Sequence, residues 1–207
     1  MIAPAIASGI VSGIVSGIAH DIAHGTIRKV LRSETALVGQ HLLRLDTDAR
    51  SRRFSHEVSD AFIADYARKS AEFGSLVFGY YFAGEIHAIA ELKPTGGIWS
   101  ATAEAAFSVE RDVANQGIAS ALMGRIIRSA RNRGVRHLML CCLTENAKMR
   151  SIASKYGAEL HIEDGAIVGD IVPQLLDYYS LVSEAYDDRL GYLHAMLDLQ
   201  IRMKNAA

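Results

Sequence analysis

The sequence predicts an α/β (α+β) fold, in which helices flank a mixed central sheet and a long helix closes the chain. Segments that alternate apolar and polar residues, as strands do, are separated by segments with apolar residues every three or four positions, as in amphipathic helices. Short turns precede the central strand, whereas a whole helix follows it, so the sheet should contain both antiparallel and parallel neighbours. A chain of 207 residues is long enough for one domain with a buried core plus extensions.

Composition narrows the class of partner. The chain has 22 basic and 23 acidic residues and a net charge of -1, so no overall field draws it to nucleic acid or to an acidic membrane. Its two cysteines, Cys141 and Cys142, are adjacent on a predicted core strand and cannot join distant segments. We interpret both as core thiols of a cytoplasmic protein.

An apolar extension, residues 1–25, begins the chain. Residues 2–19 carry no charge and place isoleucine at every fourth position, and Gly9, Gly13 and Gly17 have the spacing that lets membrane helices pack closely. The segment is only mildly apolar, however, and no basic residue precedes it. We favour a helix or tail that lies against the protein or a sister subunit. A membrane anchor, disorder and a wrongly assigned start remain open.

Helices and strands then follow in a regular order. The first half should contain a strand at 27–31, a helix capped by Ser33 and ending at Leu45, a charged connector at 46–54, a helix at 60–72 capped by Ser59, and hairpin strands at 76–82 and 86–92. The second half should contain the central strand from about Ala101 to Val109, a helix at 118–133, a parallel strand at 135–143, a helix from Asn146 to Gly157, and strands at 159–162 and 167–172. In the connector, we interpret Arg52 and Arg53 as a solvated face rather than substrate contacts.

The stretch Glu104–Met123 combines the central strand, a glycine-bearing turn and the start of a helix. In this turn, residues 115–119, small side chains would let ligand oxygens approach the backbone, and the first N–H groups of the helix have no partner within the helix. Such a turn suits a pyrophosphate. A glycine turn before a helix also occurs for packing reasons alone.

This arrangement resembles the GCN5-related N-acetyltransferase (GNAT) family, whose loop pattern is Gln/Arg-x-x-Gly-x-Gly/Ala. Gly117 and Ala119 match the pattern, whereas Ala114 stands where Gln or Arg is usual. After the next strand, Asn146 matches the family asparagine that touches the pantetheine arm of the cofactor. The resemblance implies a GNAT domain over residues 26–172 that takes acetyl-CoA as co-substrate and needs no metal.

The resemblance also implies how acetyl-CoA would bind. The pantetheine arm would pair like an added strand with backbone groups of Phe107 and Val109. The pyrophosphate would lie on backbone N–H groups of the loop and the first helical turn. These cofactor-binding residues are Asn115, Gln116, Gly117, Ile118, Ala119 and Ser120, together with Asn146.

Glu104 is the candidate general base, because the pattern around it resembles the bacterial protein-lysine acetyltransferase branch of the family. For Glu104 to act as a base near neutral pH, apolar neighbours such as Ala106 would have to raise its pKa. The alternative is an ordinary exposed strand glutamate, and Glu91 and His87 are then the reserve bases. The tyrosine acid usual in the family is replaced by Ala153, and Tyr156 could substitute only if its helix were set back.

The final helix, expected at 174–204, repeats large residues at steps of three and four, as coiled-coil helices do. This heptad seam consists of Leu176, Tyr179, Ser183, Tyr186, Leu190, Leu193 and Leu197. The helix of segment 173–207 could fold back on its own domain. We favour a homodimer, because thirty helical residues span about 45 Å, more than one face of a small domain.

Together these features predict an acetyl-CoA-dependent N-acetyltransferase that acts by direct attack with Glu104 as general base. The acceptor is an amine, either a protein lysine or a small molecule. The alternative is a non-catalytic acyl-CoA-binding module that acts through its helical tails in a complex or at a membrane. Ala114 and Ala153, which replace residues usual in the family, are the features in its favour, and Glu104 is the feature against it.

Overall fold

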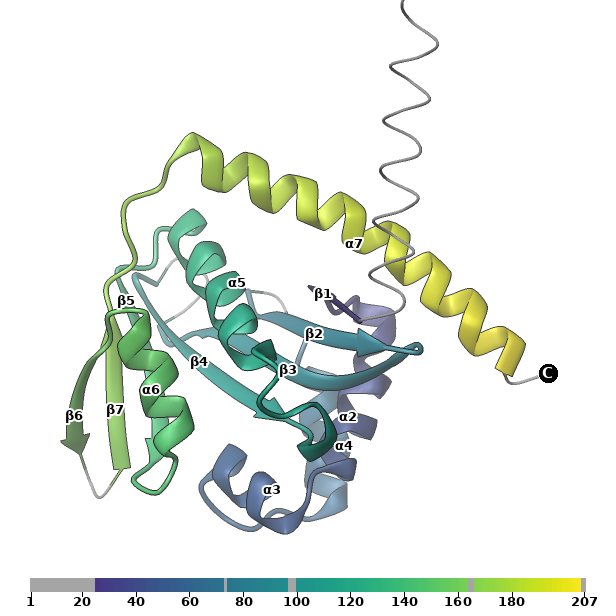
Figure 1. Ribbon diagram of the computed structural model, residues 1–207, viewed down its shortest axis with the longest axis horizontal. Helices are drawn as coiled ribbons and strands as arrows, with labels where there is room; N and C mark the ends of the chain where they lie inside the picture. The colour runs from purple at the N-terminus through teal and green to yellow at the C-terminus, as the bar shows by residue number, and fades with distance from the viewer. Residues whose placement is uncertain (1–24, 73, 97–99, 164–165, 206–207) are drawn as a thin grey trace, which may run out of the picture.

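The structure is a computed structural model that describes residues 25–72, 74–96, 100–163 and 166–205 (Figure 1). A seven-stranded sheet runs in the order β1-β2-β3-β4-β5-β7-β6. The strands are β1 (Thr26–Lys29), β2 (Leu76–Phe82), β3 (Glu85–Pro94), β4 (Thr102–Val109), β5 (His137–Leu143), β6 (Glu159–Glu163) and β7 (Ala166–Ile171). The helices are α2 (Thr35–Arg44), α3 (Thr47–Phe54), α4 (Asp60–Lys69), α5 (Ile118–Asn132), α6 (Ala147–Lys155) and α7 (Tyr178–Asn205), with short 3-10 turns η1 (Arg32–Glu34) and η2 (Arg111–Val113).

The sheet is mixed, as predicted. Only β4 and β5 pair in parallel among the described strands, and α5 is the crossover between them; the other neighbours pair antiparallel. Tight turns join β2 to β3 and bring successive strands side by side, whereas the parallel pair needs a long connection.

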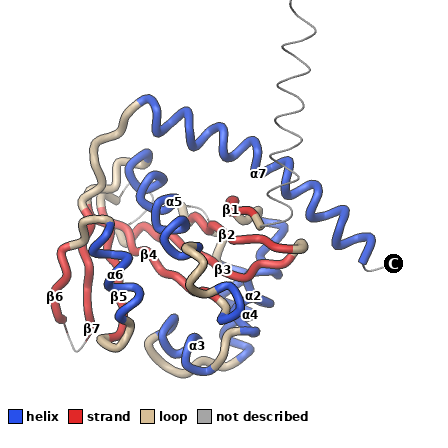
Figure 2. Tube along the Cα trace, viewed as in Figure 1, coloured by secondary structure: helices blue, strands red, loops and turns tan. Residues whose placement is uncertain are grey.

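Two apolar cores lie on opposite faces of the sheet, so that helices and sheet form three layers (Figure 2). On one face, α5 contributes a stripe of residues at helical spacing, Ile118, Leu122, Ile126 and Ala130, which packs on Ala103 and Ala105 of β4. On the other face, α2 and α4 bury Val38, Leu42, Ile63 and Ala67. Alternate residues of the central strands therefore belong to different layers.

The prediction of a charged connector at 46–54 was wrong, because residues 47–54 form helix α3. The Asp46 side chain accepts a hydrogen bond from the backbone N–H of Ala49 at 2.8 Å, which caps the helix, and Phe54 packs against the core beneath α2. The expected Ser59 cap of α4 is confirmed, since its hydroxyl accepts from the N–H of Phe62 at 3.2 Å.

Ser33 does not cap a helix. Residues 32–34 form the turn η1, and α2 starts only at Thr35. The side chain of Glu34 accepts the backbone N–H of Leu31 at 3.1 Å and a bidentate pair of hydrogen bonds from Arg28 at 2.7 and 2.8 Å. This buried glutamate stabilises the turn, whereas α2 begins without a side-chain cap.

The prediction that both cysteines are core thiols is correct for only one of them. Cys142 is buried, as expected, whereas Cys141 is exposed. Adjacent strand residues point to opposite faces, and the α5 layer covers only the Cys142 side of β5.

Helix α7 folds back on its own domain and runs past β1 and α5 (Figure 1). Its buried face is polar: Glu184 and Ser180 face α5 and β1, and Asp187 pairs with Arg125 and Arg128. The predicted seam is therefore not the face that packs on the domain. Five of its members, Leu176, Tyr179, Ser183, Tyr186 and Leu193, are exposed, and Leu190 and Leu197 are half-buried.

The predictions for residues 2–19 lie outside the described residues. No helix in the described part of the chain has the length and apolarity required to span a bilayer.

Candidate active site

Strands β4 and β5, the parallel pair at the centre of the sheet, separate halfway along β4. Their pairing runs from Thr102↔His137 to Ala105↔Leu140, although β4 continues to Val109 and β5 to Leu143. Beyond Ala105, β4 has no partner on β5 among the described residues, whereas the far edge of β5 stays paired with β7 as far as Leu143↔Ala166. A gap therefore opens beside the second half of β4.

The backbone of β4 points its free groups into this gap. The N–H of Glu110 donates to the carbonyl of His87 on β3 at 2.9 Å. Because backbone groups of successive strand residues point to opposite edges, those of Phe107 and Val109 point away from β3 and toward the gap. These are the two residues expected to pair with a pantetheine arm.

A cavity of about 670 Å³ lies at this gap, between α3, the start of α5 and the start of α6. It brings together nearly all predicted cofactor-binding residues: Phe107, Val109, Asn115, Gly117, Ile118, Ala119, Ser120 and Asn146. Gln116 instead lines a separate cavity of about 420 Å³ near β1 and α7, and its side chain donates to the carbonyl of Asp112 at 3.2 Å.

The α5 end of the cavity has the features of an anion site. Gly117 is the N-cap of α5 and adopts φ 81°, and no side-chain hydrogen bond caps the helix. A Cβ built at Gly117 would meet nothing within 4 Å, so the space above the first helical turn is open. The first N–H groups of α5 thus face the cavity wall without a partner within the helix, which suits phosphate oxygens.

Asn146 closes the opposite wall. It is the N-cap of α6, and its side-chain oxygen accepts the backbone N–H of Met149 at 3.2 Å. The side chain is therefore held at the cavity, at the point where β5 turns into α6.

Glu104 lies on the face of β4 opposite to the α5 layer. Ala103 and Ala105 point into the α5 core, so Glu104, Ala106 and Ser108 point to the α2–α4 side. Glu104 is exposed and does not line the cavity. Its carboxylate is close to Cys141: burial, with the negative charges of Glu104 and Glu163, raises the pKa of that thiol.

Glu91 is not a free base, because it is fully buried in an ion-paired network. Arg53 Nη2 lies 3.0 Å from one Glu91 oxygen, Tyr66 donates to the other at 2.5 Å, and Lys93 Nζ lies 3.2 Å from it. Burial alone would raise the pKa of Glu91, but the charges of Arg53 and Lys93 lower it overall. The solvated-face prediction was thus wrong for Arg53, whereas Arg52 is exposed and also lines the cavity.

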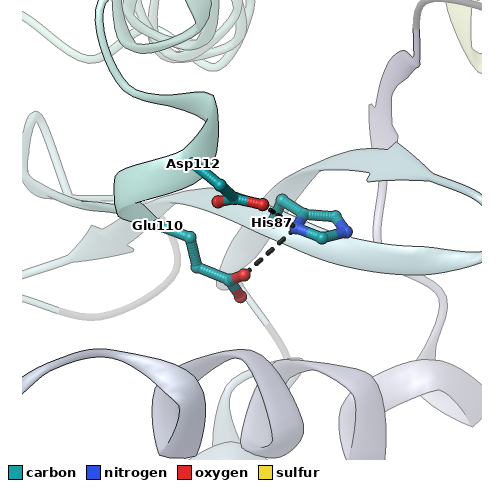
Figure 3. A group of neighbouring side chains, drawn as sticks. All are labelled: His87, Glu110 and Asp112. Atoms are coloured by element: carbon teal, nitrogen blue, oxygen red, sulfur yellow. Dashed lines mark ion pairs between the residues drawn. The ribbon is translucent and has the colours of Figure 1, made fainter.

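His87, the other reserve base, points toward two carboxylates outside the cavity (Figure 3). Its Nδ1 lies 3.1 Å from Glu110 and 3.4 Å from Asp112. The three side chains have ligand atoms within 4.8 Å of one another, as a metal site would require. However, Arg44 already neutralises the Glu110 carboxylate at 2.9 Å, which disfavours binding of a cation there.

A second hydrogen-bonded chain crosses from β4 to α2. His41 lies on the buried stripe of α2, and its Nε2 is 2.8 Å from the Ser108 hydroxyl while its Nδ1 is 2.8 Å from Glu110. Ser108 and Glu110 are two residues apart and therefore share a face. Ser108 lines the cavity. Sequence reasoning missed all three residues, because no local pattern connects α2 to the end of β4.

The position of the family tyrosine is filled by Ala153, which is buried in the α5 core. Tyr156 does not replace it. Its hydroxyl donates to the carbonyl of Ser120 at 2.7 Å and packs over Gly124, so it joins α6 to α5 and lies outside the cavity wall.

A sheet whose parallel central strands part beside the open start of a helix is the scaffold of an acyl-CoA-dependent acyltransferase. Residues 40–158, more than half of the chain, match the sequence model of the Acetyltransferase (GNAT) family. The chain belongs to this family of acetyltransferases, which use acetyl-CoA. A search among curated proteins finds no match.

Solved structures share the fold. The GNAT domain of S. lividans PAT matches with a TM-score of 0.62 and 21% identity over 72% of this chain and 90% of its own. The yncA protein of Salmonella typhimurium, solved with its cofactor acetyl-CoA, matches with a TM-score of 0.57 and 14% identity over 74% of this chain and 96% of its own. The ribosomal-protein-S18-alanine N-acetyltransferase of Escherichia coli matches with a TM-score of 0.56 and 18% identity over 74% of this chain and 97% of its own.

Proposed function

We propose that the cavity beside β4 binds acetyl-CoA and that the enzyme transfers the acetyl group to an amine, with Glu104 as general base. The observation that carries the proposal is the gap between β4 and β5, which ends at the uncapped start of α5. The gap would take the extended pantetheine arm of acetyl-CoA, and the start of α5 would take the pyrophosphate that follows the arm.

Binding would rely mainly on backbone groups. The pantetheine amides would pair with Phe107 and Val109 on the open edge of β4, and the pyrophosphate would accept hydrogen bonds from the N–H groups at Gly117–Ser120. Asn146 would hold the arm from the α6 side. Gln116 would contribute its backbone N–H alone, since its side chain is bonded to Asp112.

Chemistry would follow by direct attack. The amine nitrogen forms a bond to the thioester carbon, the C–S bond breaks, and Glu104 takes the proton that the amine nitrogen loses. The CoA thiolate leaves without a protein acid, because the tyrosine position is Ala153 and the Tyr156 hydroxyl is engaged with Ser120. A thiolate is a good leaving group near neutral pH and takes its proton from water.

The acceptor we favour is a protein lysine, and a small-molecule amine is the second candidate. Support comes from the exposed position of Glu104, on a face that a flexible lysine can reach. We also infer a cytoplasmic homodimer, in which the exposed apolar side of α7 forms the contact. That side carries Tyr179, Val182, Tyr186, Tyr192, Leu193, Met196, Leu199 and Met203.

The test is a free-thiol assay with acetyl-CoA and a panel of lysine peptides and small amines. We expect wild type to acetylate at least one class, and Glu104→Gln to lower kcat/KM by about 100-fold. Glu159→Gln is the matched control, because Glu159 is also an exposed strand glutamate but lies on β6. Acetyl-CoA binding without turnover of any amine would instead identify an acyl-CoA-binding module.

A further inference from the structure

We propose that His41 is a positioning residue for acetyl-CoA. By bonding to Ser108 and Glu110, it would hold the end of β4 in the place where the pantetheine arm is proposed to pair. His41 is wholly buried and is not among the residues that line the cavity, so it would act through β4 and not by contact with the cofactor. This inference rests on the proposed function in one respect, that acetyl-CoA occupies the cavity beside β4.

The end of β4 is paired along one edge only. The pairing of β4 with β5 stops at Ala105↔Leu140, and beyond Ala105 the described residues of β4 pair with β3 alone. A strand segment with one neighbour has fewer contacts than one with two and shifts more easily. Any such shift would move the backbone groups of Phe107 and Val109 that the arm is proposed to use.

His41 binds this strand end from the α2 side. Its Nε2 lies 2.8 Å from the Ser108 hydroxyl, and its Nδ1 lies 2.8 Å from a carboxylate oxygen of Glu110. The alternate residues, Phe107 and Val109, pack their side chains against the α5 core. The end of β4 is therefore held on both faces and at the β3 edge, and only the edge at the gap is left for a ligand.

The charge states give these hydrogen bonds a direction. Burial, the largest effect, lowers the pKa of His41, although Glu110 opposes it, so the imidazole is neutral near pH 7. A neutral imidazole beside a carboxylate donates from Nδ1, which leaves Nε2 to accept the hydrogen bond of the Ser108 hydroxyl. Arg44, also on α2, holds the same carboxylate, with Nη2 2.9 Å from it. Side chains of α2 thus fasten two alternate residues of β4.

A buried histidine with two hydrogen bonds also stabilises the fold, so the test must separate positioning from stability. A variant that is less stable but still folded at the temperature of the measurement binds acetyl-CoA as wild type does. A variant in which the end of β4 has moved binds it more weakly. The loss should fall on the pantetheine arm, because the pyrophosphate is proposed to bind at the start of α5 and not on β4.

Calorimetry with the full chain compares two ligands. Acetyl-CoA has both the arm and the pyrophosphate, whereas adenosine 3′-phosphate 5′-diphosphate has the pyrophosphate without the arm. For His41→Ala, we expect the affinity for acetyl-CoA to fall about tenfold, which corresponds to the weakening of two backbone hydrogen bonds. The affinity for the nucleotide should stay that of wild type, and its retention also shows that the variant is folded.

Further variants assign the effect to the bridge. Ser108→Ala removes one of its two links and should show the same pattern with a smaller loss. His41→Asn keeps an amide near the position of Nδ1, so it should recover part of the affinity. Ser129→Ala is the matched control, because the buried Ser129 hydroxyl also bonds to a side chain of another element, Glu184 at 2.9 Å, but joins α5 to α7. It should leave acetyl-CoA affinity unchanged.

Three results would overturn the inference. If His41→Ala binds acetyl-CoA as wild type does, the bridge only stabilises the fold, and the proposed function stands. If His41→Ala binds both ligands equally more weakly, or if Ser108→Ala binds acetyl-CoA no more weakly than Ser129→Ala, the bridge does not position the arm. The two serine variants decide by acetyl-CoA affinity alone, whether or not His41→Ala folds. If wild type binds no acetyl-CoA, the proposed function and this inference both fail.

Discussion

The guanidinium of Arg53 lies 3.0 Å from the carboxylate of Glu91, and both side chains are almost wholly buried. Arg53 comes from α3 and Glu91 from β3, so this ion pair fastens the helix that walls the cavity to the sheet beneath it. Tyr66 of α4 donates to Glu91 and accepts from Arg53, both at 2.5 Å, which links the second wall helix to the same pair.

Removal of Arg53 should destabilise the protein strongly. Arg53→Gln leaves the Glu91 charge buried without its nearest charged partner, and we expect a loss of about 3 kcal/mol in the free energy of unfolding. Arg52→Gln, the adjacent but exposed position, should change it by less than about 0.5 kcal/mol. Urea unfolding of the two variants measures the difference, and equal effects would show that the buried pair does not hold α3.

A side chain at Gly117 should block acetyl-CoA. Gly117→Arg places a long side chain in the open space above the first turn of α5, where the pyrophosphate is proposed to bind. Calorimetry should show acetyl-CoA binding weakened by more than about tenfold, or about 1.4 kcal/mol.

The matched control for that variant is Gly134→Arg. Gly134 follows the other end of α5, has a positive φ of 71°, and is equally open around its Cβ. The two variants therefore impose similar backbone strain on the same helix. If both weaken binding equally, strain rather than obstruction is the cause.

The packing of α7 on the domain should weaken at acid pH, because Glu184 becomes protonated there. Burial raises the pKa of this carboxyl, but hydrogen bonds from Lys29 and Asn132 and the charge of Arg133 outweigh burial and lower it to about 2. A lowered folded-state pKa stabilises the protein above the unfolded pKa of about 4.5, and this contribution is lost as pH falls toward about 2.

The measurement compares wild type with Glu184→Gln by urea unfolding at several pH values. The variant should be less stable at pH 7, by at most about 3 kcal/mol. The difference should shrink between about pH 4.5 and pH 2, because wild type also becomes protonated there. A difference that stays constant over this range would mean that the Glu184 charge does not hold the helix.

The outer side of α7 should form the dimer contact. Tyr186 and Leu193, one heptad apart, are 59% and 47% exposed, so a charge at either position should leave the monomer folded. Light scattering should show a dimer for wild type and a monomer for Tyr186→Glu/Leu193→Glu at micromolar concentration. Ile162→Glu, an exposed apolar position on β6, should remain dimeric. A monomeric wild type would reject the contact.

Much of the fold follows from local patterns in the sequence. Alternation on the central strand separates Ala103 and Ala105 from Glu104, and the structure places them on opposite faces. The Ser59 cap and the strand, turn and helix at 104–123 are local as well. The loop and gap residues could be predicted because a glycine turn before an amphipathic helix determines where free N–H groups lie.

Contacts between distant segments could not be predicted in this way. His41 and Ser108 are 67 residues apart, and only the packing of α2 on β4 brings the imidazole to the hydroxyl. Arg53 has the sequence context of a solvated residue, yet α3 turns it onto Glu91. The heptad spacing of α7 predicts a helix with an apolar side, but not which side meets the domain. The charges that select this side lie on β1 and directly after α5, since Lys29 and Arg133 each lie 2.9 Å from Glu184.

The sequence by itself thus determined the elements, their order, the loop at Gly117 and the family. Periodicity, capping and turn chemistry act within a few residues and are visible in the chain. Only the tertiary structure decided which charged and hydroxyl side chains meet at the cavity. Such meetings depend on the distance and rotation between packed layers, which no local pattern specifies.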